Sequence, residues 1–322
     1  MPFLLAGAVV VSASLLPRIS TGTPDTLEIY AIKVEFQYED TDNSLTTGRG
    51  TFDSDADTAG SNYSLDPRGS RASSAYWEKH FQFARNYFLA ASNGQLVIEY
   101  KVFPQNGSQS YTVDKHIIDY NRTARKSDEK VAAYDSARTR DYLDFVSDAI
   151  HKAAADASGP FADSLPTSGD RHRVFMIIHA GASRLVDGGT LGSDGADTQG
   201  DFLDIFVPAD AWPYLAADTA HPEDSLGIAL TGMVVDTVHE VMVVSETASQ
   251  DGLNWGINGV LVSQIGQQIG LPLTYDVVEG ISRLGYFDVM DFAGYNAGNG
   301  FFPVLPSAWL RAYLGWAKVT EL

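Results

Sequence analysis

The sequence predicts an α+β fold in which a mixed sheet packs against several helices. Two observations indicate the element types. Short apolar or alternating runs typical of strands recur at residues 27–38, 95–103, 174–179 and 234–244. Residues 75–91 and 141–157 instead carry apolar side chains at the spacing of amphipathic helices. A third observation is composition: a chain of 322 residues with 44% hydrophobic residues can bury a substantial core.

The first half of the chain alternates strands, a loop and one helix. Residues 27–38 alternate enough to predict a strand, and residues 39–73 are rich in Asp, Ser, Thr and Gly, which predicts a long surface loop. The next segment, 75–91, is a predicted helix. Asn93-Gly94 should end it and lead into the strand 95–103.

The second half supplies another helix, two strands and two helices near the end. Residues 141–157 have a helical apolar stripe formed by Leu143, Val146, Ile150 and Ala154. The run 174–179 predicts a buried strand, and 234–244 predicts another. Helices are expected at 255–269 and 306–314, the first of them ending at Gly270-Leu271-Pro272.

Charge and cysteine content limit the function classes. The chain has 41 acidic and 22 basic residues, a formal charge of −19, which argues against nucleic acid or an anionic membrane as a partner. It has no cysteine, which excludes disulfides, thiolate zinc sites and thiol nucleophiles.

The N-terminal residues 3–16 form an uncharged apolar run. This length suits the core of a secretion signal and is too short for a comfortable membrane span. Residues 11–13, Val-Ser-Ala, would suit a signal peptidase, although only Met1 and Pro2 precede the run and neither is basic. A buried first strand is the alternative. We therefore expect a signal or apolar segment at 1–22, one domain at 23–322, and a secreted or cell-envelope location.

Residues 263–273 have the frame His-Glu-x-x-His-x-x-Gly-Leu-Pro-Asp of a zinc-protease helix, with the metal chemistry replaced. Gly270, Leu271 and Pro272 match the frame, whereas the two histidines, the glutamate and the aspartate are replaced by Ser263, Gln267, Gln264 and Leu273 respectively. Two imidazoles at i and i+4 lie on one helix face and can hold zinc, and the adjacent carboxylate can activate its water. A hydroxyl and neutral amides are poor zinc donors, and Gln264 cannot act as a general base.

His239-Glu240 is the single adjacent His-Glu pair in the chain. Val243 stands where a second histidine would be needed, and the surrounding valines predict a strand, on which i and i+4 do not converge. A solvent-facing pair is therefore favoured over a metal site here.

The chain resembles the immune inhibitor A family of secreted bacterial zinc metalloproteases from about residue 28 to residue 316. The matching landmarks, in shared order and spacing, are the altered helix and residues 32–36, 47–53, 87–88, 91–96, 174–182, 284–291, 306–309 and 314–316. The resemblance implies a zincin-like domain with a central cleft helix. It also implies that His179 borders the cleft and that Met290 lies in a turn beneath the former metal position. A hydrogen-bonded structural role for His179 is the alternative.

An acidic, glycine-rich loop at 187–201 is a candidate calcium site. Calcium prefers six to eight oxygen ligands, which carboxylates and backbone carbonyls of glycine turns can supply. The candidate ligands are Asp187, Asp194, Asp197 and Asp201, and a solvated loop without an ion is the alternative.

The function that follows is that of a catalytically inactive, metalloprotease-like protein, a pseudoenzyme that binds a peptide or protein in the former cleft. No zinc is expected, and calcium is the candidate cofactor. Two alternatives stay open: an active metallopeptidase with other ligands, and a structural module of a longer exported protein. Oligomeric state stays open as well.

Overall fold

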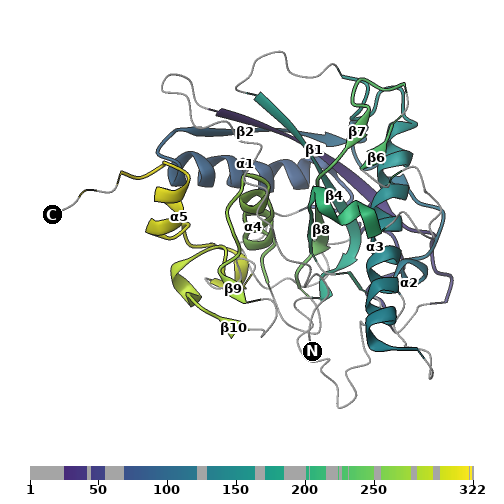
Figure 1. Cartoon of the computed structure of the whole chain (residues 1–322). Coiled ribbons are helices and arrows are strands. Elements are labelled where there is room, and N and C mark those ends of the chain that lie inside the picture. Colours follow the sequence, from purple (N-terminus) through teal and green to yellow (C-terminus); the bar gives the residue numbers. More distant parts are fainter. Residues whose placement is uncertain are drawn as a thin grey trace.

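The protein has a mixed α and β fold with one main mixed sheet, as predicted (Figure 1). The computed structural model describes residues 25–41, 45–54, 69–121, 129–163, 171–184, 201–202, 204–214, 224, 227–230, 232–249, 255–276, 281–292, 298–318 and 320. The N-terminal segment expected at 1–22 lies outside these residues.

The main sheet has six strands in the order β2-β1-β4-β8-β5, and β3 pairs with β1. All pairs are parallel except that of β5 with β8. Parallel neighbours need crossover connections, and helices α1 and α3 lie in two of these. The bounds are β1 (Asp25–Glu35), α1 (Ser74–Ala91), β2 (Leu96–Phe103), β3 (Tyr111–Thr112), α3 (Val131–Ala154), β4 (Arg171–Ala182), β5 (Phe206–Val207) and β8 (Val241–Thr247).

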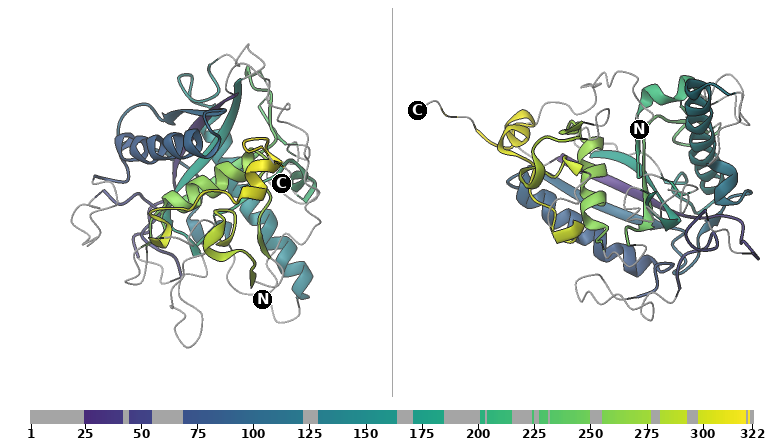
Figure 2. Two further views of the ribbon diagram at one scale, coloured as in Figure 1. Left: turned by 90° about the vertical axis from the view of Figure 1, so that its left-hand side faces the viewer. Right: turned by 90° about the horizontal axis from the view of Figure 1, so that it is seen from below.

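Helices α1 and α3 cover opposite faces of the sheet. Phe81 of α1 stacks on Tyr100 of β2 with ring centroids 5.4 Å apart, and Phe145 of α3 packs against His179 of β4 at 5.9 Å. Tyr100 is paired with Ile29 of β1, and His179 is paired with Val34 of the same strand, so one partner is odd-numbered and the other even-numbered. Because alternate residues of a strand point to opposite faces, the two helices lie on different sides, as the left view of Figure 2 shows.

Helix α4 (Asn258–Gln268) lies on the same side as α1. The Asn258 amide oxygen lies 2.8 Å from His80 Nδ1 in α1, so the start of α4 is tied to that helix. We refer to the side covered by α1 and α4 as the α4 face, and to the other side as the α3 face.

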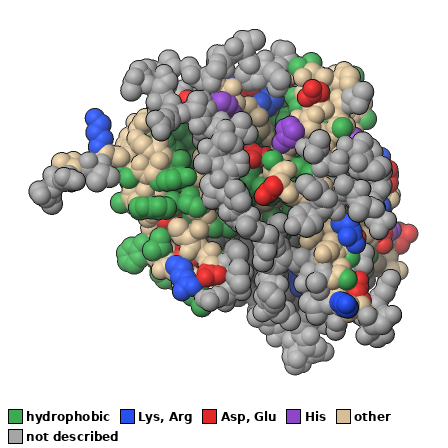
Figure 3. All heavy atoms as spheres, in the orientation of Figure 1, with side chains coloured by type: hydrophobic (Ala, Val, Ile, Leu, Met, Phe, Trp, Pro, Cys, Tyr) green, Lys and Arg blue, Asp and Glu red, His purple; other side chains and the backbone are tan. Residues whose placement is uncertain are grey.

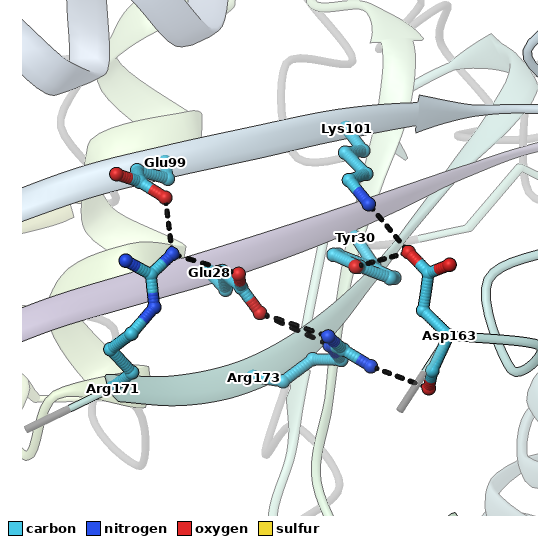
Figure 4. Close-up of polar contacts among 7 residues, drawn as sticks. All are labelled: Glu28, Tyr30, Glu99, Lys101, Asp163, Arg171 and Arg173. Carbon is cyan, nitrogen blue, oxygen red and sulfur yellow. Dashed lines mark hydrogen bonds and ion pairs between the residues drawn. The ribbon is translucent and has the colours of Figure 1, made fainter. Parts of the chain in front are cut away.

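An ionic network ties three strands together on the α3 face near their amino ends (Figure 4). Arg171 of β4 donates to Glu28 of β1 at 2.9 Å and to Glu99 of β2 at 2.5 Å. Arg173 also pairs with Glu28, at 3.1 Å. These contacts link neighbouring strands laterally, which indicates a structural role for this cluster.

The remaining elements are short. They are α2 (Ile117–Tyr120), the antiparallel pair β6 (Ile228–Ala229) and β7 (Thr237–Val238), the antiparallel pair β9 (Tyr275–Asp276) and β10 (Ile281–Ser282), the 3₁₀ helices η2 (Ala209–Tyr214), η4 (Gly285–Phe287) and η6 (Gly298–Gly300), and the last helix α5 (Ala308–Tyr313).

The predicted helix ends are confirmed. Asn93 and Gly94 adopt φ angles of 53° and 80°, and the Gly94 amide donates to Leu89 O at 2.8 Å, which closes the last turn of α1. Gly270 has φ 87°, and the Leu271 amide donates to Gly266 O at 2.9 Å at the end of α4. Both turns use a left-handed residue to cap the final carbonyls.

Several predicted elements were wrong in extent; strand β4, for example, spans Arg171–Ala182 and not only 174–179. Helix α3 begins at Val131, ten residues before the predicted start at 141, because alanine and arginine sustain a helix even where the apolar stripe is weak. The predicted strand 234–244 is two strands, β7 and β8, since the chain leaves a small hairpin and enters the main sheet at His239-Glu240.

Among the helices of the described residues, none combines the length and the apolar character that crossing a bilayer requires.

Candidate functional site

Helix α4 is the centre of the candidate site, and its first nine residues are buried. Asn258 anchors its start: besides the contact with His80, its Nδ2 donates to Phe301 O at 3.2 Å. Gly256, just before the helix, has no room for a side chain, because a Cβ there would lie 2.6 Å from the Phe301 ring. The helix is thus fixed between α1 and the segment that follows η6.

The altered zinc-frame positions lie on and just beyond this helix. Ser263 and Gln264 are 1% and 3% exposed, and among the described residues neither Ser263 Oγ nor Gln264 Oε1 has a hydrogen-bond partner. Gln267 follows Ser263 by one turn and is half-buried, while Leu273, past the helix stop, is 40% exposed. The structure therefore places Ser263 and Gln267 on one helix face, and Leu273 outside the core.

Met290 packs directly against the backbone of α4. Its side chain is fully buried, and a Cβ at Gly266 would lie 2.6 Å from Met290 Sδ. The Thr274 amide donates to Met290 O at 3.1 Å, and the Met290 amide donates to Asp288 Oδ1 at 2.9 Å. These bonds hold a methionine-containing turn beneath the second half of the helix.

The structure does not bring His179 together with these residues. His179 is fully buried on the α3 face, between the rings of Phe36, Phe145 and Phe202 at 5.4–6.1 Å. Burial lowers its pKa to about 4, although Nδ1 lies 2.8 Å from Ala180 O. Alternate residues of a strand point to opposite faces, and His179 therefore points away from α4. This position fits a hydrogen-bonded structural role for His179.

Of the four candidate calcium ligands, the described residues include only Asp201. The other three, Asp187, Asp194 and Asp197, lie outside them. Asp201 is fully buried, and its carboxylate accepts hydrogen bonds from Thr47 N at 2.8 Å and from Thr47 Oγ1 at 2.5 Å. In the part of the chain that the structure describes, no three His, Asp or Glu side chains form a metal-binding group.

Glu246 is a buried acid that the sequence did not single out. Ser245 is registered with His179, so the next residue, Glu246, points to the α4 face at the carboxyl end of β8. Its Oε1 accepts from Gly181 N and its Oε2 from Asp53 N, both at 2.9 Å. Burial raises its pKa to about 7, against the lowering effect of Arg71 and of the two amides. Such a carboxyl can gain or lose a proton near neutral pH.

Contacts continue from Glu246 to the start of α4. Arg71 pairs with Asp53 at 3.6 Å. Glu246 and Tyr76 also interact electrostatically with Arg71, and Tyr76 forms a side-chain hydrogen bond with it. The Tyr76 ring packs 4.8 Å from the His80 ring, and His80 contacts Asn258. The only sequence signal for this group was an acid at the end of the continuous apolar run of β8.

A buried lysine lies on the same face. Lys33 of β1 is registered with Ile178, which places it on the side opposite His179. Its ammonium donates to Ala72 O at 2.5 Å and to Gly107 O at 2.9 Å. Burial lowers its pKa to about 8, while Glu35 opposes this shift. The α4 face thus concentrates titratable groups near the carboxyl ends of the strands, where parallel sheets commonly bind ligands.

No protein-family model matches the chain, and no curated protein matches it either. The chemistry of the site is therefore inferred from its own residues.

Proposed function

We propose that the chain is a catalytically inactive, metalloprotease-like protein whose former cleft beside α4 binds a peptide or protein segment. One observation carries the proposal. Helix α4 packs against the Met290 turn, and its sequence, which resembles a zinc-protease frame, has Ser263, Gln264 and Gln267 where that frame has two imidazoles and a carboxylate.

The chemistry of these side chains supports a loss of catalysis. Zinc sites in proteins use imidazole, thiolate and carboxylate donors, and water activation needs a group with a basic oxygen or nitrogen. A serine hydroxyl and two neutral amides offer neither. Gln267, which is half-buried, does offer a hydrogen-bond donor and an acceptor, which suit recognition of a peptide backbone.

The neighbourhood of α4 also supports peptide binding. Strand β5 is the last strand of the main sheet among the described residues, and it lies close to α4. An outer strand presents backbone groups to which an extended peptide can add as a further strand. Export to the cell envelope or the medium belongs to the same proposal and follows from the family resemblance.

Metal content and activity test the proposal directly. We expect purified protein to contain no stoichiometric zinc by elemental analysis and to cleave no general protease substrate at saturating zinc. About one tightly held zinc per chain, lost on changing Ser263 or Gln267 to alanine, would overturn it.

Restoring the frame is the sharper test. The variant Ser263→His, Gln264→Glu, Gln267→His and Leu273→Asp should bind zinc in calorimetry, because helix spacing puts both new imidazoles on one face. Proteolysis should be weak or absent, since ligand orientation depends on surrounding partners. The matched control, Gln264→Glu with Leu273→Asp, adds two carboxylates without imidazoles and should bind more weakly. Equal binding by both folded variants would contradict the alignment of α4 to the zinc frame.

A further inference from the structure

The chain contains four Asn-Gly pairs, and the fold treats them differently. They are Asn93-Gly94, Asn106-Gly107, Asn258-Gly259 and Asn299-Gly300. In such a pair the backbone nitrogen of the glycine can attack the side-chain carbonyl carbon of the asparagine, because glycine has no Cβ to obstruct the approach. The reactivity of each pair in the folded protein therefore depends on whether these two groups are free to meet.

Hydrogen bonds restrain two of the pairs. Asn93 Nδ2 donates to Trp316 O at 2.7 Å, and the Gly94 N–H donates to Leu89 O at 2.8 Å. Asn258 is buried, and hydrogen bonds hold both ends of its side-chain amide. In both pairs these bonds must break before the glycine nitrogen can attack.

The third pair, Asn299-Gly300 in η6, lies in apolar surroundings. Figure 3 shows apolar side chains gathered on the side of the molecule formed by α5 and its neighbours, and in η6 a Cβ at Gly298 would lie 3.1 Å from the Phe302 ring. Asn299 is exposed, but Gly300 is buried. An apolar environment disfavours the negative charge that the glycine nitrogen carries during attack, so this pair should react slowly.

Asn106-Gly107 is the unrestrained pair. Residues 105–109 are exposed, and among the described residues neither the Asn106 side chain nor the Gly107 N–H makes a hydrogen bond. The Gly107 carbonyl, in contrast, accepts from Ser74 N at 3.0 Å, from Ser74 Oγ at 2.9 Å and from Lys33 Nζ at 2.9 Å. The Lys33 ammonium and the amino end of α1 thus lie next to Gly107, and both favour negative charge on its nitrogen.

We propose that Asn106 is a site of spontaneous deamidation in the folded protein. Hydroxide removes the Gly107 N–H proton, the nitrogen forms a bond to Asn106 Cγ, and the Cγ–Nδ2 bond breaks as the leaving nitrogen takes a proton from water and departs as ammonia. Water then opens the cyclic imide at one of its two carbonyl carbons. The product is aspartate or isoaspartate, so the overall reaction consumes one water and releases one ammonia.

The isoaspartate product alters the start of α1. It adds a methylene to the main chain just before Gly107, which shifts the carbonyl that Ser74 and Lys33 share. Ser74 is the first residue of α1, and its N–H has no partner within the helix, so loss of this acceptor weakens the helix start. The inference is independent of the proposed function.

Peptide mapping of the full chain by mass spectrometry, after incubation at mildly alkaline pH in water labelled with heavy oxygen, tests the proposal. Asn106 should gain the labelled oxygen, and Asn93 and Asn258 should do so at least about tenfold more slowly, because their hydrogen bonds must open first. In urea the four pairs should react at similar rates, which controls for the reactivity of the sequence itself. Reaction at Asn106 in the folded chain no faster than at Asn93 or Asn258, or slower than at Asn299, would overturn the proposal.

A variant pair gives a second readout. An isoaspartate methyltransferase should label the aged natural chain but label aged Asn106→Gln much less, because ring closure from the longer side chain is slow. The matched control Asn299→Gln should be labelled as the natural chain is. Ageing should also lower the Tm of the natural chain and of Asn299→Gln but not that of Asn106→Gln. Equal labelling of the two variants would contradict the assignment to Asn106.

Discussion

Near the carboxyl ends of its strands, the sheet has aromatic rings on the α3 face and charged groups and backbone amides on the α4 face. On the α3 face, Phe145 contacts the rings of Phe36, His179 and Phe202. On the α4 face, the Glu246 carboxylate accepts hydrogen bonds from two backbone amides and lies near Arg71. Both environments exclude water, but rings surround the His179 imidazole, whereas hydrogen-bond donors surround the Glu246 carboxylate.

The comparison shows how burial acts on different groups. Burial lowers the pKa of His179 to about 4 and keeps the imidazole neutral. It raises the pKa of Glu246 to about 7, which places the proton equilibrium of this carboxyl near neutral pH. Burial also raises the pKa of Asp204, which accepts a hydrogen bond from Ser245 on the α3 face, to about 6, so proton-dependent behaviour is expected from buried acids on both faces.

The largest effect should come from opening the aromatic cluster. Phe145→Ala removes a fully buried ring stacked on Phe202 at 4.7 Å, and should lower the free energy of unfolding by about 3–5 kcal/mol. Urea denaturation measures this. Phe83→Ala, at a half-buried ring of α1, is the control and should cost clearly less. Similar losses would show that the α3 face is not the better packed one.

The second effect concerns pH. The pKa of Glu246 rises from 4.5 in the unfolded chain to about 7 in the folded one. Between these values the folded protein keeps the proton and the unfolded chain loses it, so stability falls as pH rises and levels off above about pH 7.

Comparison with Glu246→Gln isolates this contribution, since Asp204, whose pKa burial raises to about 6, is present in both proteins. The natural chain should lose about 3 kcal/mol relative to the variant between pH 4.5 and 7. The side-chain amide of the variant cannot accept hydrogen bonds from both backbone N–H groups. This loss changes the free energy of unfolding of the variant by an amount that does not vary with pH. A difference that stays constant over this range would refute the assignment.

The smallest effect contrasts two buried serines on helices. Ser263→Ala removes a hydroxyl with no hydrogen-bond partner among the described residues, so stability should change by less than about 0.5 kcal/mol or should rise. Ser147→Ala on α3 removes a donor to Asp224 Oδ2 and should cost about 1–3 kcal/mol. Thermal unfolding of both variants checks the contrast. A comparable loss at Ser263 would mean that its hydroxyl has a partner in solution.

Local patterns in the sequence predicted many elements of the fold. The positions of α1, β2 and α4 follow from apolar spacing and from the turns at Asn93-Gly94 and Gly270. The start of α3 was missed because its first ten residues lack a clear apolar stripe. The candidate site was predicted only along α4, where its residues are close in sequence.

The sequence by itself determined which chemical groups α4 carries, because Ser263, Gln264 and Gln267 are spaced within one helix. Tertiary structure decided which other residues join them. Glu246 and Gly181 come from different strands, and the parallel register alone brings them within hydrogen-bond distance. The same register turns His179 to the opposite face, since a shift of one residue along a strand reverses the direction of its side chain.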